Sequence, residues 1–151
     1  MNLGAMSVRF RAERSFHGLA PAVLKSGVQK YLRRGELEKG LWCLVELDLF
    51  SLGNADLEAL AARDQSTPQA TLKRLQSLRT NTVNRLVVMM SEEVSVHSSD
   101  LPELLLGHYQ RWERTREEPS SRVELVNMFE LLVAAEKSRV ISDYKTIYNL
   151  P

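Results

Sequence analysis

The sequence predicts an all-α protein that folds as a single domain of six or seven helices. From Pro21 onward, apolar residues recur at the spacing of one helix face, and proline, glycine or capping residues separate these runs at short intervals. The alternation from Val8 to Ala12 is too short to build a sheet alone. With 151 residues, of which 44% are hydrophobic and 26% charged, the chain can bury one core without disulfides or metals.

We expect an N-terminal arm over residues 1–20 and a helical domain over residues 21–151. The arm carries several arginines, but Glu13 and the lack of a clean amphipathic face argue against a transit peptide. Apolar runs are too short to cross a bilayer, so we expect no membrane association. The single Cys43 cannot form an internal disulfide, which fits an intracellular protein, cytoplasmic or nuclear.

The first two helices are predicted from their ends. Pro21 suits a first helical turn, where its missing amide hydrogen would have had no intrahelical partner, and Gly35 stops the helix. Glu36 then places negative charge at the start of a second helix, which runs to about Leu49.

The middle of the chain holds three candidate helical segments. Asn54 is a candidate cap for a short helix through Ala62, and Thr67 with Pro68 opens another that reaches about Leu78. A central helix over residues 81–94 follows, because five apolar residues there share one face.

Three further segments complete the helical pattern. Ser99 or Asp100 caps a helix that Pro119 ends, and Ser120 or Ser121 starts the next. A last helix is predicted from about Lys137 to Tyr148, with an apolar stripe made by Val140, Ile141, Tyr144 and Ile147.

Three segments occur in the order of a known family. They are residues 26–36 with Leu41-Trp42, residues 84–94 and residues 136–144. Together they resemble the helical region that follows the ATPase core in AAA+ replication-associated recombination ATPases, which are relatives of the clamp loaders. In that family the stretches read as a Lys-x-Ile-Arg turn, an Arg-Leu-x-x-x-x-Ser-Glu-Asp helix and a Lys-Ser-Asn stretch ending near a tyrosine.

The resemblance implies a clamp-loader-collar-like fold, whose helices serve oligomerisation and packing around a ring. It therefore implies a homo-oligomer, or a docking module, that works with replication or repair proteins in DNA replication, recombination or repair. Glu93 stands where the family commonly has aspartate, and Ser95 where a glycine normally follows.

A phosphate-binding loop is missing from the sequence. The nearest approach to one, Gly35 to Gly40, continues with Leu41-Trp42 where such a loop needs lysine and a hydroxyl residue to hold phosphates and magnesium. We therefore expect no ATP hydrolysis, no cofactor and no enzymatic activity. Glu93 and His97 could share a metal, but two ligands without a third make a weak site, so no metal is predicted.

Basic residues form two groups that are candidates for contact with single-stranded or branched DNA, or with an acidic partner. The formal net charge of only +1 makes this a local argument, although residues 1–39 carry eight basic and three acidic side chains. The alternative for the first group is a purely structural role, in which these cations interact favourably with the exposed carbonyls at a helix C-terminus. The candidates are Lys30, Arg33 and Arg34 in the first group, Lys73, Arg74, Arg79 and Arg85 in the second, and Lys137 apart from both. If the fold joins these groups, the chain is a nucleic-acid-binding accessory protein.

A few remaining side chains have structural interpretations. Helical spacing favours an ion pair between Arg85 and Glu92, with Glu93 solvated. Cys43 is expected to be a small buried hydrophobe. Trp42 and Trp112 are expected to be core or interface anchors, with base stacking as the alternative.

Overall fold

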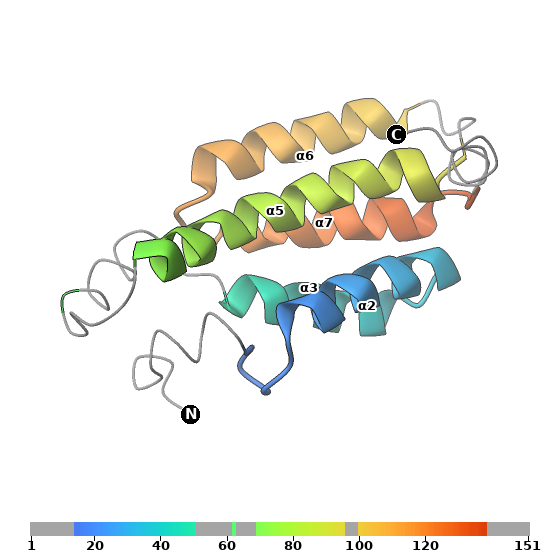
Figure 1. The fold of residues 1–151 in the computed structure, drawn as a ribbon. Helices are drawn as coiled ribbons and strands as arrows, with labels where there is room; N and C mark the ends of the chain where they lie inside the picture. Colours follow the sequence, from blue (N-terminus) through green and yellow to red (C-terminus); the bar gives the residue numbers. More distant parts are fainter. Residues whose placement is uncertain (1–13, 51–61, 63–68, 96–99, 139–151) are drawn as a thin grey trace, which may run out of the picture.

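The computed structural model describes residues 14–50, 62, 69–95 and 100–138, and in these residues the protein is all-helical (Figure 1). Five helices are present there: α2 (Pro21–Arg34), α3 (Leu37–Phe50), α5 (Gln69–Glu93), α6 (Leu101–Thr115) and α7 (Ser121–Ala134). The predicted all-α class is confirmed, while the described part falls short of the predicted six or seven helices. The helix predicted over residues 54–62 lies outside the described residues except for its last one.

Helices α2 and α3 are the first two helices that the sequence predicts, and they pack against each other as a hairpin. Pro21 occupies the first turn of α2, and Gly35 ends the helix in the left-handed conformation, at φ 69°. The amide of Gly35 donates to the carbonyl of Leu32, and the amide of Glu36 donates to that of Tyr31, at 3.1 and 2.9 Å. Glycine is favoured here because a side chain strains this conformation.

Helix α5 is one continuous helix of 25 residues where the sequence predicts two, so the predicted break after Leu78 is wrong. The segment between the two predicted helices holds polar residues but neither glycine nor proline. Just after this segment, the Thr82 hydroxyl donates to the Leu78 carbonyl at 2.9 Å, so its polar side chain is satisfied within the helix. Leu78, Thr82 and Val83 are all buried, and their packing outweighs the weak local propensity.

Helices α6 and α7 form a second antiparallel hairpin (Figure 1). Pro102 lies in the first turn of α6, as predicted, and Asp100 is the N-cap residue but makes no side-chain cap hydrogen bond. Ser99, the other predicted cap, lies outside the described residues. At the start of α7, the Ser121 hydroxyl donates back to the Glu118 carbonyl at 2.7 Å. The predicted boundary near Pro119 is confirmed.

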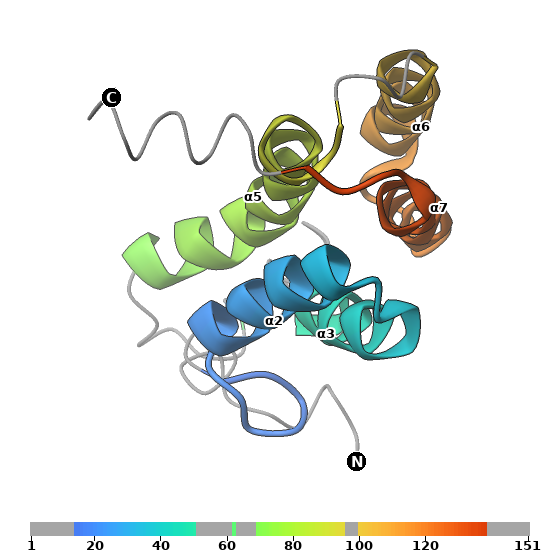
Figure 2. The ribbon, with the colours of Figure 1, turned by 90° about the vertical axis from the view of Figure 1, so that its right-hand side faces the viewer.

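The two hairpins and α5 enclose one core. Seen end-on in Figure 2, the α2–α3 hairpin lies on one side, α6 lies farthest from it, and α5 and α7 lie between them. Side chains from α3, α5 and α7 meet at the centre, where their apolar surface is removed from water. The largest fully buried residues are Leu24, Leu32, Leu44, Leu47, Leu86, Met89, Trp112, Leu125, Met128 and Phe129.

The chain after α7 pairs with the chain after α5. Val94 and Lys137 form an isolated antiparallel bridge, the Ser95 amide donates to Glu136, and the Ser138 amide donates to Glu93. Lys137 and Ser138 are therefore extended, and the prediction that a helix begins at Lys137 is wrong at that position. The remainder of that predicted helix lies outside the described residues.

Residues 14–20, at the end of the predicted arm, pack against α3. Ser15 is fully buried, and its amide donates to the Leu19 carbonyl at 2.8 Å. The His17 amide and its Nδ1 contact the two carboxylate oxygens of Glu46 at 2.7 and 3.0 Å. Burial alone would raise the pKa of Glu46, but hydrogen bonds from Ser15 and His17 outweigh it and lower that pKa. None of the described helices is long and apolar enough to span a membrane.

Candidate functional site

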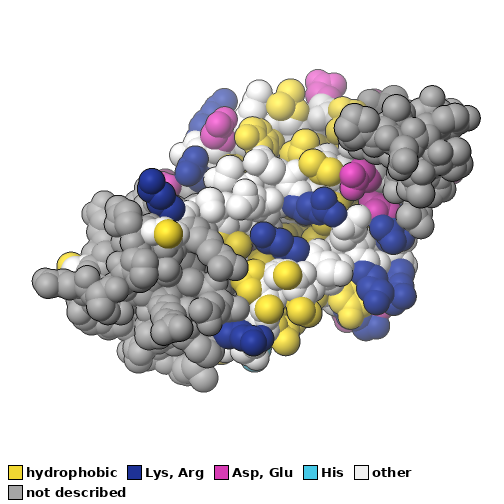
Figure 3. Space-filling view, in the orientation of Figure 1, with side chains coloured by type: hydrophobic (Ala, Val, Ile, Leu, Met, Phe, Trp, Pro, Cys, Tyr) yellow, Lys and Arg dark blue, Asp and Glu magenta, His cyan; other side chains and the backbone are white. Residues whose placement is uncertain are grey.

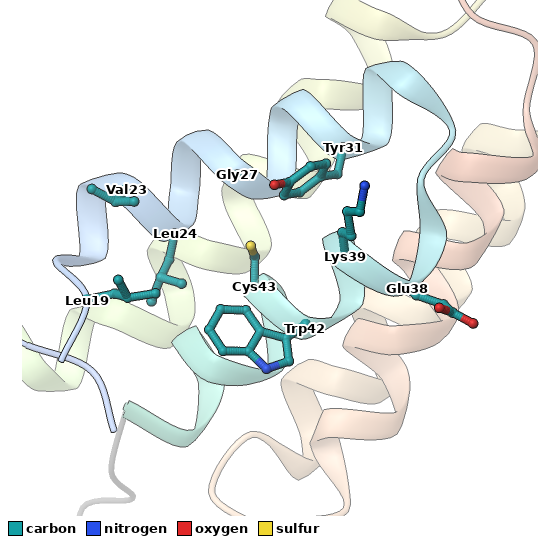
Figure 4. Close-up of a pocket in the computed structure, with 9 residues that line it drawn as sticks. All are labelled: Leu19, Val23, Leu24, Gly27, Tyr31, Glu38, Lys39, Trp42 and Cys43. Atoms are coloured by element: carbon teal, nitrogen blue, oxygen red, sulfur yellow. The ribbon is translucent and has the colours of Figure 1, made fainter. Parts of the chain in front are cut away.

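An apolar groove of about 450 Å³ lies between α2 and α3 (Figure 4). One wall is a stripe on α2 with a spacing of four residues, Val23, Gly27 and Tyr31, which therefore lies along one helix face. The rest of the lining is Leu19 and Leu24 together with Glu38, Lys39, Trp42 and Cys43 of α3. The groove is thus walled by apolar side chains, with charged residues at one end.

Gly27 sets the depth of this groove. A Cβ atom at Gly27 would lie 2.8 Å from the Sγ atom of Cys43, so a larger residue would force the two helices apart. Cys43 is buried, as predicted, and burial raises the pKa of its thiol. The thiol is a protonated part of the groove wall at neutral pH.

Two large apolar side chains project at the groove rim. Trp42 is 47% exposed and Val23 is 58% exposed, and both line the groove. Trp112, in contrast, is 2% exposed and belongs to the core. Of the two predicted anchors, Trp42 therefore has its surface available to another molecule.

Charged residues at the Tyr31 end of the groove include both signs. The Lys39 ammonium lies 5.7 Å from the centre of the Tyr31 ring and forms an ion pair with Glu36. Glu38 is exposed beside it. This end of the groove therefore carries both positive and negative charge.

Arg33, a predicted contact residue, is engaged within the fold. It donates from Nε and Nη2 to the two carboxylate oxygens of Glu93, at 2.8 and 2.6 Å. This hydrogen bonding raises the pKa of Arg33 further. Glu93 is 1% exposed, so the pair fixes the end of α2 against the end of α5.

Arg79 and Lys137 are also engaged within the fold. Arg79 donates to Asp48 at 3.0 Å and to the Arg116 carbonyl at 2.5 Å. The Lys137 ammonium donates to the carbonyls of Leu132, Val133 and Ala135 at 2.6 to 2.7 Å, and so caps the C-terminus of α7. Burial lowers the pKa of Lys137.

The predicted ion pair between Arg85 and Glu92 is replaced by a different arrangement. Arg85 donates to the side-chain oxygen of Gln29, whose amide donates to Glu93 at 2.9 Å. The buried carboxylate is thus Glu93, which the sequence assigned to solvent, and its ion-pair partner is Arg33. Spacing within one helix could not reveal a partner 60 residues away.

Three of the remaining predicted contact residues lie on the surface. Lys30, Arg34 and Lys73 are exposed, and the side chain of Arg74 is not among those that the structure describes. On the face shown in Figure 3, Lys and Arg side chains stand in separate groups with apolar and uncharged atoms between them. The fold does bring Arg85 of the second group beside the first group, because Arg85 donates to Gln29, the residue before Lys30.

Sequence reasoning missed a buried carboxylate at Asp48. Its side chain is fully buried between Arg79 of α5 and Arg122 of α7, with an Nε–Oδ2 distance of 2.5 Å to Arg122. The sequence feature that could have indicated this burial is the position of Asp48 between Leu47 and Leu49, in the apolar run that ends α3. Asp48 joins three helices, and its role follows from contacts that are distant in sequence.

Within the described residues, no group of three or more His, Cys, Asp or Glu side chains gathers in a way that could hold a metal ion. No family model matches the chain, and comparison with curated proteins and with solved structures gave no match.

Proposed function

We propose that this chain is a non-catalytic helical module that self-associates through the α2–α3 groove. The observation that carries the proposal is the apolar groove with Trp42 and Val23 exposed at its rim. Its place in DNA replication, recombination or repair rests on the resemblance to the helical region of the recombination ATPases.

The occupant we propose is a second copy of the chain. A two-fold symmetric contact needs one surface that carries both a projection and a hollow, because each copy must offer to the other what it receives. The groove has both, since the exposed Trp42 projects at its rim and the apolar hollow lies beside it. The adjacent Glu38 and Lys39 carry opposite charges and can pair across the same symmetry axis.

Trp42 is the expected energetic centre of this contact. Tryptophan is enriched among interface residues that dominate binding, because its large apolar ring is buried at little cost in side-chain entropy. Val23 widens the apolar patch on the opposite wall. Charged residues gather at one end of the groove, where they would form part of a polar rim.

We expect Val23→Asp to lower the association constant by at least about tenfold, because a carboxylate would be buried in an apolar contact. Native mass by light scattering over a concentration series measures this. Val123→Asp is the matched control, since Val123 is also 58% exposed but lies on α7, away from the groove. The proposal would be contradicted by a native chain that is monomeric throughout, or by equal effects of the two variants.

Nucleic-acid binding is the second candidate function, because Lys30 and Arg34 are exposed one helical turn apart on α2. If these two residues contact phosphates, Lys30→Glu with Arg34→Glu should abolish binding of a single-stranded oligonucleotide and native binding should weaken steeply with salt. Fluorescence anisotropy at two salt concentrations distinguishes this candidate. Binding that is unaffected by the double variant would exclude these residues as the contact.

A further inference from the structure

A second apolar groove, of about 390 Å³, lies between α5 and α6. Residues of the last turns of α5 form one wall, and residues of the first half of α6 form the other. They are Asn84, Val87, Met90, Pro102, Leu105, Leu106 and Tyr109. Figure 3 shows apolar side chains exposed between these two helices.

This groove is open because α6 packs chiefly against α7 and only lightly against α5. Val87 is 38% exposed and Leu106 is 54% exposed, so the groove walls expose more apolar surface than a closed helix pair would. Covering them would remove apolar surface from water, which is favourable.

After α7 the chain returns to the C-terminal end of α5. Lys137 pairs with Val94, and the Ser138 amide donates to the Glu93 carbonyl at 3.0 Å, directly at the C-terminal end of α5. Met90, in the groove wall, lies one helical turn before Glu93. The Lys137 ammonium, bonded to the carbonyls at the end of α7, holds this anchor in place.

The sequence after Ser138 has an apolar stripe suited to the groove and is long enough to span it. Residues 139–151, outside the described part, carry apolar side chains at helical spacing, namely Val140, Ile141, Tyr144 and Ile147. As a helix, 13 residues extend about 20 Å, whereas the α5 wall from Asn84 to Met90 extends about 9 Å. We propose that residues 139–151 dock through this apolar stripe into the α5–α6 groove of the same chain.

The anchor at Ser138 favours this occupant over a second copy. A segment tethered at the end of its groove binds at an effective concentration in the millimolar range, far above ordinary protein concentrations. The inference is independent of the proposed function, which uses the α2–α3 groove.

A double-mutant cycle between Leu106→Asp and Ile141→Asp tests the proposal. Each single variant should lower the melting temperature by at least about 3 °C, because each places a carboxylate in the proposed contact. The second substitution should add little once the first is present, since the contact is then already lost. Melting followed by circular dichroism gives all four values.

Matched controls lie beside both substituted residues. Leu104 is 50% exposed on the same helix but does not line the groove, and Ser142 follows Ile141 off the apolar stripe. Leu104→Asp and Ser142→Asp should shift the melting temperature by less than about 1 °C. Equal shifts for Leu104→Asp and Leu106→Asp, or additive effects of the two test substitutions, would overturn the proposal.

Cross-linking identifies which chain supplies the segment. In a Cys43→Ser background, Leu106→Cys and Tyr144→Cys should be joined by a short bismaleimide within one chain, at the mass of one chain plus one linker. A product of doubled mass would assign the groove to a second copy and overturn the proposal, as would no cross-link at all.

Discussion

Replacing Asp48 by alanine is expected to reduce the free energy of unfolding by about 3 kcal/mol. The Asp48 side chain is fully buried, and it is the carboxylate to which both Arg79 of α5 and Arg122 of α7 donate. Alanine would leave the Arg79 guanidinium, only 12% exposed, without that carboxylate. Arg122 is 31% exposed and can regain water, which keeps the expected loss at the lower end for broken buried pairs.

Urea denaturation of the Asp48→Ala protein measures this loss. Glu130→Ala is a suitable control, because Glu130 is exposed on α7 and its removal should change the free energy by less than about 0.5 kcal/mol. If the two variants were equally stable, Asp48 would not be holding α3 to α5 and α7.

Gly40→Ala is the second substitution with a large expected effect, a loss of at least about 2 kcal/mol. A Cβ atom at Gly40 would lie 2.2 Å from Cζ and 2.7 Å from Cε1 of Phe129. Phe129 is fully buried in the core, so its ring has little room to move. The roughly 1 kcal/mol that alanine gains over glycine in a helix is smaller than this clash.

Gly107→Ala provides the opposite expected result. Gly107 is also inside a helix, α6, but its nearest neighbour to an added Cβ is the end of the Arg111 side chain at 3.5 Å. Alanine there should stabilise the protein by about 0.5 to 1 kcal/mol. Thermal or urea denaturation of both variants compares them, and a destabilised Gly107→Ala or a stabilised Gly40→Ala would contradict the packing described.

The local parts of the fold could be predicted because their causes are local. Pro21 and Gly35 define the ends of α2 through backbone geometry that each residue type carries with it. The continuity of α5 could not be predicted in this way, because burial of Leu78 and Val83 depends on helices distant in sequence. The extended conformation of Lys137 likewise depends on its bridge to Val94.

The candidate site was predicted less well than the fold. Arg33 and Arg79 were predicted to contact DNA or an acidic partner, but each binds a buried carboxylate of this chain more than 30 residues away in the sequence. Helical spacing identifies partners within one helix, and it cannot identify ion pairs between residues on different helices. The groove had one local sequence feature, because Gly27 lies four residues from both Val23 and Tyr31. The close approach of the two helices at Gly27 involves Cys43 of the facing helix, which the spacing within α2 could not predict.

The native mass in solution, measured at low and at high salt with and without a single-stranded oligonucleotide, tests the central claim most directly. An apolar contact through the α2–α3 groove predicts at least twice the mass of one chain, retained at high salt and independent of the oligonucleotide. A monomer under all conditions, or a mass that rises only with the oligonucleotide and falls again with salt, would contradict it.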